Sequence, residues 1–362
     1  MRHVHRIGKM NPLIAFLALT LSTFAANAAT FEGRRGMSLD LWDTWPSEKT
    51  WGDEKVLLPF PEWKRYIGNA ELEALKQNGL DFVRLPVDPA PFLSDASATL
   101  HDRLYDEVTA AVDLALEANL NVLVDIHPIP AGERSIGTSE ILKDTANFEA
   151  FLEFLRRIAA SLKDRDPKRV ALEVFNEPTI DCDSDGTSNW PGQMKQAFAA
   201  ARASATKLTL ALSGACWGGA EGLAKIDPKD IADDNIIWSF HSYDPFILTH
   251  QGATWAGDFA AHVYGLPFPL HELAEDQRSS AIKEVRDRLE SLAPAGKRSG
   301  HLTYFDEEIA KIDTKEGLER EMEKAFAIAA DWAKTNGVDP GDILLGEFGM
   351  IRQEYGNPHV VP

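Results

Sequence analysis

Short apolar runs alternate along this chain with longer segments in which apolar residues recur every three or four positions. The short runs have the length and β-branched content of strands that are buried on both faces. The longer segments have the period of amphipathic helices. The pattern predicts strands at 37–41, 82–86, 121–126, 170–175, 208–212, 236–240 and 343–345. It predicts helices at 70–77, 102–118, 148–162, 193–204 and 318–335.

This regular alternation favours an α/β fold, in which helices cover a parallel sheet. Seven strands are predicted, and seven or eight strand-helix units in this length fit a (β/α)8 TIM barrel better than an open doubly wound sheet. No GxGxxG or GxxxxGK[ST] motif follows a predicted strand, so the main support for a nucleotide-binding fold is missing.

The segment 245–311 interrupts the rhythm, because it is long, mixed and rich in Gly, Pro and charge. It contains a helix-like stretch at 281–292. A loop of this size in a compact domain is usually an active-site insertion or a small subdomain. We therefore expect one barrel domain over 29–362 that carries this insertion.

Composition narrows the classes of function. The 362 residues include 37 Lys and Arg against 56 Asp and Glu, and the net charge of -19 disfavours nucleic-acid binding. Cys182 and Cys216 are the two cysteines, too few for a four-thiolate metal site. They follow neighbouring predicted strands, so they either join two loops in a disulfide or remain independent thiols.

The first 28 residues have the pattern of a signal peptide. Arg2, Arg6 and Lys9 precede the apolar run 13–24, and Ala26-Asn27-Ala28 has the small residues of a cleavage site. The run is too short to span a bilayer. We expect a secreted or periplasmic protein with no membrane segment in its mature form.

Polar residues with catalytic chemistry stand at the ends of the predicted strands. In a β/α barrel these ends meet on one rim, where active sites lie. The residues concerned are Arg84, His127, Asn176, Glu177, His241, Tyr243 and Glu347. Two carboxylates on one rim are what glycosidic cleavage needs, one as proton donor and the other as nucleophile or base. Arg84 and Tyr243 suit the task of keeping one of them ionised.

The motifs around these residues are similar to those of glycoside hydrolase family 5, the cellulase family. They occur in the family's order, and the resemblance runs from about Arg35 to Gly349. They are Phe82-Val83-Arg84-Leu85-Pro86, Val124-Asp125-Ile126-His127, Phe175-Asn176-Glu177-Pro178, His241-Ser242-Tyr243 and Gly346-Glu347-Phe348-Gly349.

The resemblance implies a role for each of these residues. Glu177 would be the general acid/base and Glu347 the nucleophile of a retaining β-glycosidase, with carboxyl groups about 5–5.5 Å apart. Asn176 would bind the sugar 2-hydroxyl, and Arg84 and Tyr243 would position Glu347. His127 and His241 would line the same subsite. The implied substrate is a β-linked polysaccharide or oligosaccharide, with endo cleavage of a β-1,4-glucan as the leading expectation.

Tryptophans in loops on this rim are candidates for stacking on sugar rings. Trp42 and Trp45 follow the first predicted strand, and Trp217 follows the fifth. Trp190 and Trp255 are further candidates. Packing in the core is the alternative for each of them.

Neither a cofactor nor a metal ion is expected. The acidic stretch 181–186 resembles the start of a calcium loop, but Gly192 stands where the twelfth position requires Glu. A metal-dependent barrel hydrolase would need clustered ligands such as His-x-His after the first strand, and that strand has no His.

The sequence departs from the family at its C-terminal end. Thirteen residues follow Gly349, too few for an eighth strand and helix, and no Trp follows Glu347. We therefore expect an incomplete barrel and a monomer. The alternative to an active enzyme is a truncated, catalytically inactive glycan-binding relative, or a fragment that does not fold.

Overall fold

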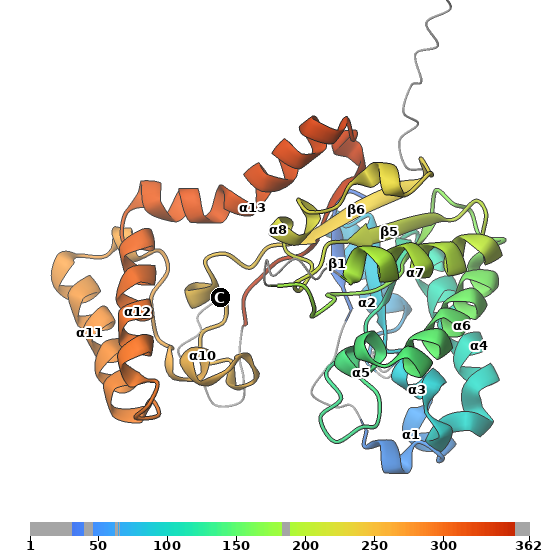
Figure 1. The fold of residues 1–362 in the computed structure, drawn as a ribbon, viewed down its shortest axis with the longest axis horizontal. Coiled ribbons are helices and arrows are strands. Elements are labelled where there is room, and N and C mark those ends of the chain that lie inside the picture. Colours follow the sequence, from blue (N-terminus) through green and yellow to red (C-terminus); the bar gives the residue numbers. More distant parts are fainter. Residues whose placement is uncertain (1–30, 40–45, 62–63, 65, 183–188, 352–362) are drawn as a thin grey trace, which may run out of the picture.

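The computed structural model describes residues 31–39, 46–61, 64, 66–182 and 189–351 (Figure 1). Its centre is a sheet of seven parallel strands in which each strand pairs with the next one along the chain. The strands are β1 (Gly36–Ser38), β2 (Phe82–Val87), β3 (Asn121–Ile126), β4 (Val170–Glu173), β5 (Thr209–Ser213), β6 (Ile236–His241) and β7 (Ile343–Glu347). They form a nearly closed barrel, so the predicted TIM-barrel fold class is confirmed.

The helices alternate with the strands as the hydrophobic pattern predicts. Those before β5 are α1 (Glu54–Leu57), α2 (Asn69–Gln77), α3 (Ala90–Leu93), α4 (His101–Glu117), α5 (Thr138–Lys143), α6 (Thr145–Leu162) and α7 (Trp190–Ser204). Those after it are α8 (Ala220–Leu223), α9 (Phe246–Thr249), α10 (Asp258–His262), α11 (Glu275–Leu292), α12 (Arg298–Ile312) and α13 (Lys315–Asn336). Within the described ranges, no helix combines the length and the apolar character that a membrane span requires.

The strands place alternate side chains on opposite faces of the barrel wall. One set packs outward against the helices and forms the main core, with Val83, Leu85 and Val87 as the members from β2. The other set points inward and begins with an apolar group of Phe82, Leu123, Ala171, Ala211 and Ile237. Two positions further along β2, β3, β4 and β6, the inward residues are polar, namely Arg84, Asp125, Glu173 and Ser239.

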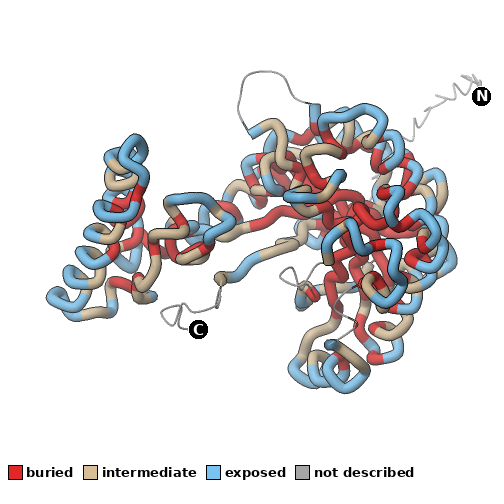
Figure 2. The backbone as a smooth tube through the Cα atoms, turned by 90° about the horizontal axis from the view of Figure 1, so that it is seen from below, coloured by how far each residue is buried: buried red, intermediate tan, exposed pale blue. Residues whose placement is uncertain are grey.

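The insertion forms a helical unit with its own apolar cluster. Its helices α11 and α12 pack on each other away from the sheet, and α13 leads from them back to the barrel (Figure 1). Figure 2 shows this unit joined to the main body by a narrow connection. The cluster runs from Ile247 to Leu318, so it extends a few residues beyond the predicted range 245–311.

Candidate active site

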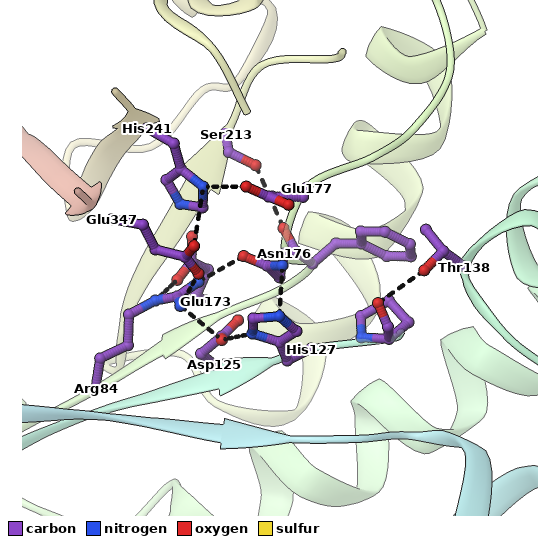
Figure 3. A network of polar contacts seen from close by, with 12 residues as sticks. Arg84, Asp125, His127, Thr138, Glu173, Asn176, Glu177, Ser213, His241 and Glu347 are labelled. Carbon is purple, nitrogen blue, oxygen red and sulfur yellow. Dashed lines mark hydrogen bonds and ion pairs between the residues drawn. The ribbon is translucent and has the colours of Figure 1, made fainter. Parts of the chain in front are cut away.

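All seven rim residues predicted from the strand ends belong to one network of direct contacts. Figure 3 shows six of them, and the seventh, Tyr243, bonds to Glu347. They come from β2, β6, β7 and the segments that follow β3, β4 and β6. Parallel strands bring these positions to one end of the barrel. The sequence expectation that they converge is therefore correct.

Arg84 is the hub of the network. Its side chain is 2% exposed, and its Nε donates to Glu173 Oε2 at 2.8 Å. Nη1 lies 2.5 Å from Glu347 Oε1 and 3.0 Å from Asp125 Oδ2, while Nη2 donates to Asn176 Oδ1 at 2.7 Å. Burial alone would lower the pKa of Arg84, but the surrounding carboxylates raise it well above its ordinary value. A permanent positive charge therefore sits against the end of β7.

Glu347 is held as a carboxylate. Besides Arg84, Tyr243 donates its hydroxyl to Glu347 Oε2 at 2.7 Å, and His241 Nδ1 lies 3.7 Å from the same oxygen. Burial alone would raise the pKa of Glu347, but His241, Arg84, His127 and the Tyr243 hydroxyl together lower it far below the usual range. Burial and the same carboxylate raise the pKa of Tyr243, so its proton stays on the phenol.

Glu177 stands beside this carboxylate in a different environment. His241 Nδ1 lies 2.7 Å from Glu177 Oε1, and the Glu177 side chain is 26% exposed against 14% for Glu347. One oxygen of Glu177 lies within 4.8 Å of one oxygen of Glu347. This close approach of one oxygen pair is compatible with the separation of about 5–5.5 Å between the carboxyl groups of retaining glycosidases.

The backbone around the two carboxylates is unusual. Glu177 has φ of 44°, in the left-handed region that non-glycine residues seldom adopt. On β7, a Cβ at Gly346 would lie 2.4 Å from Ser239 Oγ and 2.9 Å from His241 Nε2. Only glycine permits that close approach, which brings β7 against β6 just before Glu347. The Ser242 N–H donates to the Glu347 carbonyl at 3.0 Å and holds this register.

Asn176 lies between Arg84 and His127 and contacts both side chains. Asp125 Oδ2 lies 2.6 Å from His127 Nδ1, and Asn176 Nδ2 lies 2.9 Å from His127 Nε2. Burial alone would lower the pKa of His127, but the charge and hydrogen bond of Asp125 raise it. Asn176 is thus oriented from both ends of its amide, and its NH₂ group keeps one further hydrogen to donate.

Sequence reasoning missed Asp125 and Glu173 as members of the site. Both side chains are 0% exposed, and both contact Arg84. Each is a lone carboxylate that follows a run of apolar strand residues, two positions after an apolar residue of the inner cluster. A buried carboxylate requires a partner charge, so this pattern was the available signal.

The oxygens of Glu347 already accept hydrogen bonds from protein groups, which does not suit a metal-binding site. Two overlapping sets, Asp125–His127–Glu347 and Glu177–His241–Glu347, place their oxygens and ring nitrogens within 4.8 Å of one another. However, Arg84 and Tyr243 direct their donors to both oxygens of Glu347. A cation there would have to compete with the guanidinium at Oε1 or with the phenol hydroxyl at Oε2.

A disulfide joins the loops that follow β4 and β5. Cys182 and Cys216 are bonded, with a Cα–Cα distance of 4.6 Å. Two backbone bonds run beside it, from Cys216 N to Ile180 O at 3.0 Å and from Trp217 N to Pro178 O at 3.1 Å. The loop that carries Trp217 is thereby fixed to the loop that carries Glu177.

The tryptophan candidates differ in the structure. Trp217 is 54% exposed and Trp255 is 67% exposed, so both present a free face. Trp190 is 1% exposed, packs on Phe175 and donates Nε1 to Ser213 O at 2.9 Å. It is a core residue, and its candidacy as a sugar-binding residue was wrong. Trp42 and Trp45 lie outside the described residues, as does 183–186 of the calcium-like stretch.

A parallel β/α barrel with two neighbouring carboxylates at the carboxyl ends of its strands has the architecture of the barrel glycoside hydrolases. The chain belongs to glycosyl hydrolase family 5, the cellulase family, whose model matches residues 44–359. The resemblance read from the sequence motifs is therefore confirmed.

Curated proteins similar to this chain are named endoglucanases. Endoglucanase 3 of Fibrobacter succinogenes is 25% identical over 295 residues, which are 79% of this chain and 41% of that protein. Endoglucanase C of Acetivibrio thermocellus is 27% identical over 210 residues, 56% of this chain and 58% of that protein. The chain thus spans only about half the length of these relatives.

Solved structures share the fold. The endoglucanase Cel5A of the hyperthermophile Thermotoga maritima has a TM-score of 0.55 at 20% identity, over 88% of this chain and 80% of that one. The structure of Thermotoga maritima Cel5A in complex with mannotriose gives 0.56 at 21% identity, with the same coverage.

Removing the hub charge should destabilise the protein strongly. In Arg84→Met, Glu173 remains buried without its guanidinium and Asp125 keeps only His127, which should lower the free energy of unfolding by about 3–5 kcal/mol. Urea unfolding at neutral pH measures it. The matched control is Arg286→Met, which breaks the exposed pair with Asp306 and should cost about 1 kcal/mol or less. Equal losses in both variants would contradict the hub role.

The disulfide should contribute to stability as well. It closes a loop with a sequence separation of 34, and such bonds contribute roughly 2–4 kcal/mol. The double variant Cys182→Ser/Cys216→Ser should lose this amount in urea unfolding. Dithiothreitol should weaken the wild-type protein to the same level and leave the variant unchanged. Coincident curves for the oxidised protein and the variant would show that the bond contributes nothing.

The contribution of His241 should depend on pH. Burial alone would lower the pKa of His241, but Glu347 and Glu177 raise it above its ordinary 6.5. The stabilisation is then complete below about 6.5 and is lost as pH rises through the higher pKa of the folded state. The difference in unfolding free energy between wild type and His241→Gln should therefore shrink from pH 6 to pH 9. A constant difference would contradict this ion pairing.

Proposed function

We propose that this chain is a retaining β-glycoside hydrolase that cleaves β-1,4-glucan internally. The observation that carries the proposal is the contrast between its two neighbouring carboxylates. Glu347 is bound by a guanidinium and a phenol hydroxyl, whereas Glu177 lies beside His241 and is partly exposed. Glu347 is held in the ionised form by these donors, whereas Glu177 contacts an imidazole and is the more exposed of the two carboxylates.

In the first step, Glu177 as a carboxylic acid protonates the glycosidic oxygen while Glu347 Oε attacks C1. The C1–oxygen bond breaks, the aglycone leaves with the proton, and a glycosyl ester forms on Glu347. In the second step, Glu177 as a carboxylate takes a proton from water, and the water oxygen attacks C1. Glu347 then leaves as a carboxylate, and two inversions give net retention.

The neighbouring residues hold this chemistry in place. Arg84 and Tyr243 fix the orientation and charge of Glu347. Their donors are already in place when Glu347 changes from anion to ester, so no water has to reorient in that step. Asn176 Nδ2 uses one hydrogen toward His127 and has one left for the sugar 2-hydroxyl. His127 and His241 line the same space, and the exposed face of Trp217 offers a surface for a further sugar ring.

The choice of substrate rests on the relatives. The relatives are named endoglucanases, and structures of Thermotoga maritima Cel5A include complexes with cellobiose and with mannotriose. The proposal also includes export to the periplasm or the medium, which the N-terminal sequence pattern and a disulfide both favour.

Release of reducing sugar tests the proposed activity. The full chain, expressed with its leader, should release sugar from carboxymethyl-cellulose or barley β-glucan, and Glu347→Gln should release none. Mannan and xylan in the same assay show whether the glycan is a glucan. Release from none of the four polymers would overturn the proposed activity and favour an inactive relative.

A further inference from the structure

A chain of aromatic rings leads from the catalytic rim onto the insertion. Tyr243, which bonds to Glu347, contacts the ring of His250 edge-to-face, with centroids 5.2 Å apart. His250 stacks on Phe246 at 3.9 Å with an interplanar angle of 14°. The same imidazole meets Trp255 edge-to-face at 5.4 Å.

The burial of these rings changes along the chain. His250 is 8% exposed, whereas Phe246 is 36% exposed and Trp255 is 67% exposed. Burial lowers the pKa of His250 to about 4, so the imidazole is neutral over the ordinary pH range and packs as an uncharged ring. The buried His250 thus supports two exposed aromatic faces.

The backbone fixes these rings to the active site. Thr249 Oγ1 donates to the Tyr243 carbonyl at 2.6 Å, which ties the end of α9 back to the catalytic tyrosine. The Ile351 N–H donates to the Thr249 carbonyl at 2.9 Å, which ties α9 to the segment after β7. Trp255 lies in a short 3₁₀ helix, Thr254–Ala256, in front of α10. The exposed rings are therefore anchored at the carboxyl ends of β6 and β7.

We propose that Trp255 and Phe246 form a second sugar-binding subsite, which takes a ring of a neutral β-linked glycan beyond the residue bound at Glu347. Scattered exposed aromatic residues are common on protein surfaces and need no explanation. Here two of them share one buried support that touches the residue bonded to Glu347. Flat apolar faces of this kind suit the C–H faces of a sugar ring, as Trp combines a large apolar surface with a polar edge.

This inference rests on the proposed function. It makes the insertion a determinant of the preferred length of the glycan substrate. A glycan long enough to reach Trp255 should gain affinity that a short glycoside does not. The variant is Trp255→Ala. The matched control is Phe268→Ala, an aromatic residue of the same insertion that is 55% exposed and takes no part in the ring chain.

Calorimetry in the Glu347→Gln background measures binding without turnover. With cellohexaose and mannohexaose as probes, Trp255→Ala should weaken the better-bound hexasaccharide about tenfold, as expected for loss of one aromatic anchor. Phe268→Ala should leave its affinity unchanged, and Trp255→Phe should restore most of it because the flat face remains. In otherwise wild-type protein, Trp255→Ala should lower kcat/KM more on the hexasaccharide than on an aryl glycoside.

Each result decides one of the two proposals. Equal hexasaccharide affinity with and without Trp255, or no binding of either probe, would overturn the subsite. Trp255-dependent binding in a protein that hydrolyses neither polymer nor aryl glycoside would support the subsite and overturn the proposed activity.

Discussion

Glu347→Gly should lower kcat on any substrate by at least about 10⁴-fold, because it removes the group that forms the covalent intermediate. The cavity it leaves lies beside Arg84 and Tyr243, whose donors remain directed at an anion. Added azide should occupy that place, attack C1 of an activated aryl β-glycoside directly, and restore turnover. The product should be the α-glycosyl azide, with inverted configuration, which proton NMR identifies.

The control for this variant is a carboxylate in the same part of the molecule. Glu221 lies on α8, after the loop that carries Trp217, and pairs with Lys324 on the surface. Glu221→Gln should keep the activity of the wild-type protein. Turnover by Glu347→Gly without azide, or an azide product of retained configuration, would contradict the nucleophile role.

Glu177→Ala should have a different signature, one that depends on the leaving group. A general acid contributes about 10²–10⁴-fold when the leaving oxygen needs a proton. Hydrolysis of polymer should fall by that factor. The first step on a dinitrophenyl glycoside should hardly change, because dinitrophenolate leaves without protonation.

Pre-steady-state kinetics separate formation of the glycosyl-enzyme from its hydrolysis. In Glu177→Ala, a burst of dinitrophenol should precede slow turnover, because water attack now lacks its base. Azide should speed turnover and give the β-glycosyl azide, the anomer opposite to that from Glu347→Gly. An equal loss on polymer and dinitrophenyl glycoside would contradict the acid/base assignment.

Periodicity and strand-end position were enough to predict the sheet and most of the site. The seven strands begin within one residue of their predicted starts, since runs buried on both faces are apolar throughout. Arg84, Asn176, Glu177, His241 and Glu347 meet because parallel strands end on one rim. The roles of these residues and the separation of the two carboxyl groups were predicted from the family resemblance.

Other features depend on contacts between segments distant in the sequence. Asp125 and Glu173 stand opposite each other on the paired strands β3 and β4, and both bind Arg84 on β2. The burial of Trp190 depends on Phe175 and Ser213, which approach it from β4 and β5. The helical unit made by α11 and α12 follows from its own apolar cluster, and no local pattern relates that cluster to the barrel.

The left-handed backbone at Glu177, Cys216 and Trp217 is a further case. No glycine marks these three positions, so turn chemistry does not predict them. The disulfide and the two backbone bonds between the β4 and β5 loops impose the conformation. Strained backbone held by its surroundings is common at functional sites, and here it occurs in the two loops that carry Glu177 and Trp217.

The central claim is that Glu347 forms a covalent bond to the sugar. A 2-deoxy-2-fluoro-β-cellobioside with a dinitrophenyl leaving group slows the second step and traps the intermediate. Intact-protein mass spectrometry should show one added fluorocellobiosyl group, and peptide mapping should place it on Glu347. Loss of activity should follow the adduct in time. A hydrolysed reagent without any adduct, or an adduct on another residue, would contradict the account.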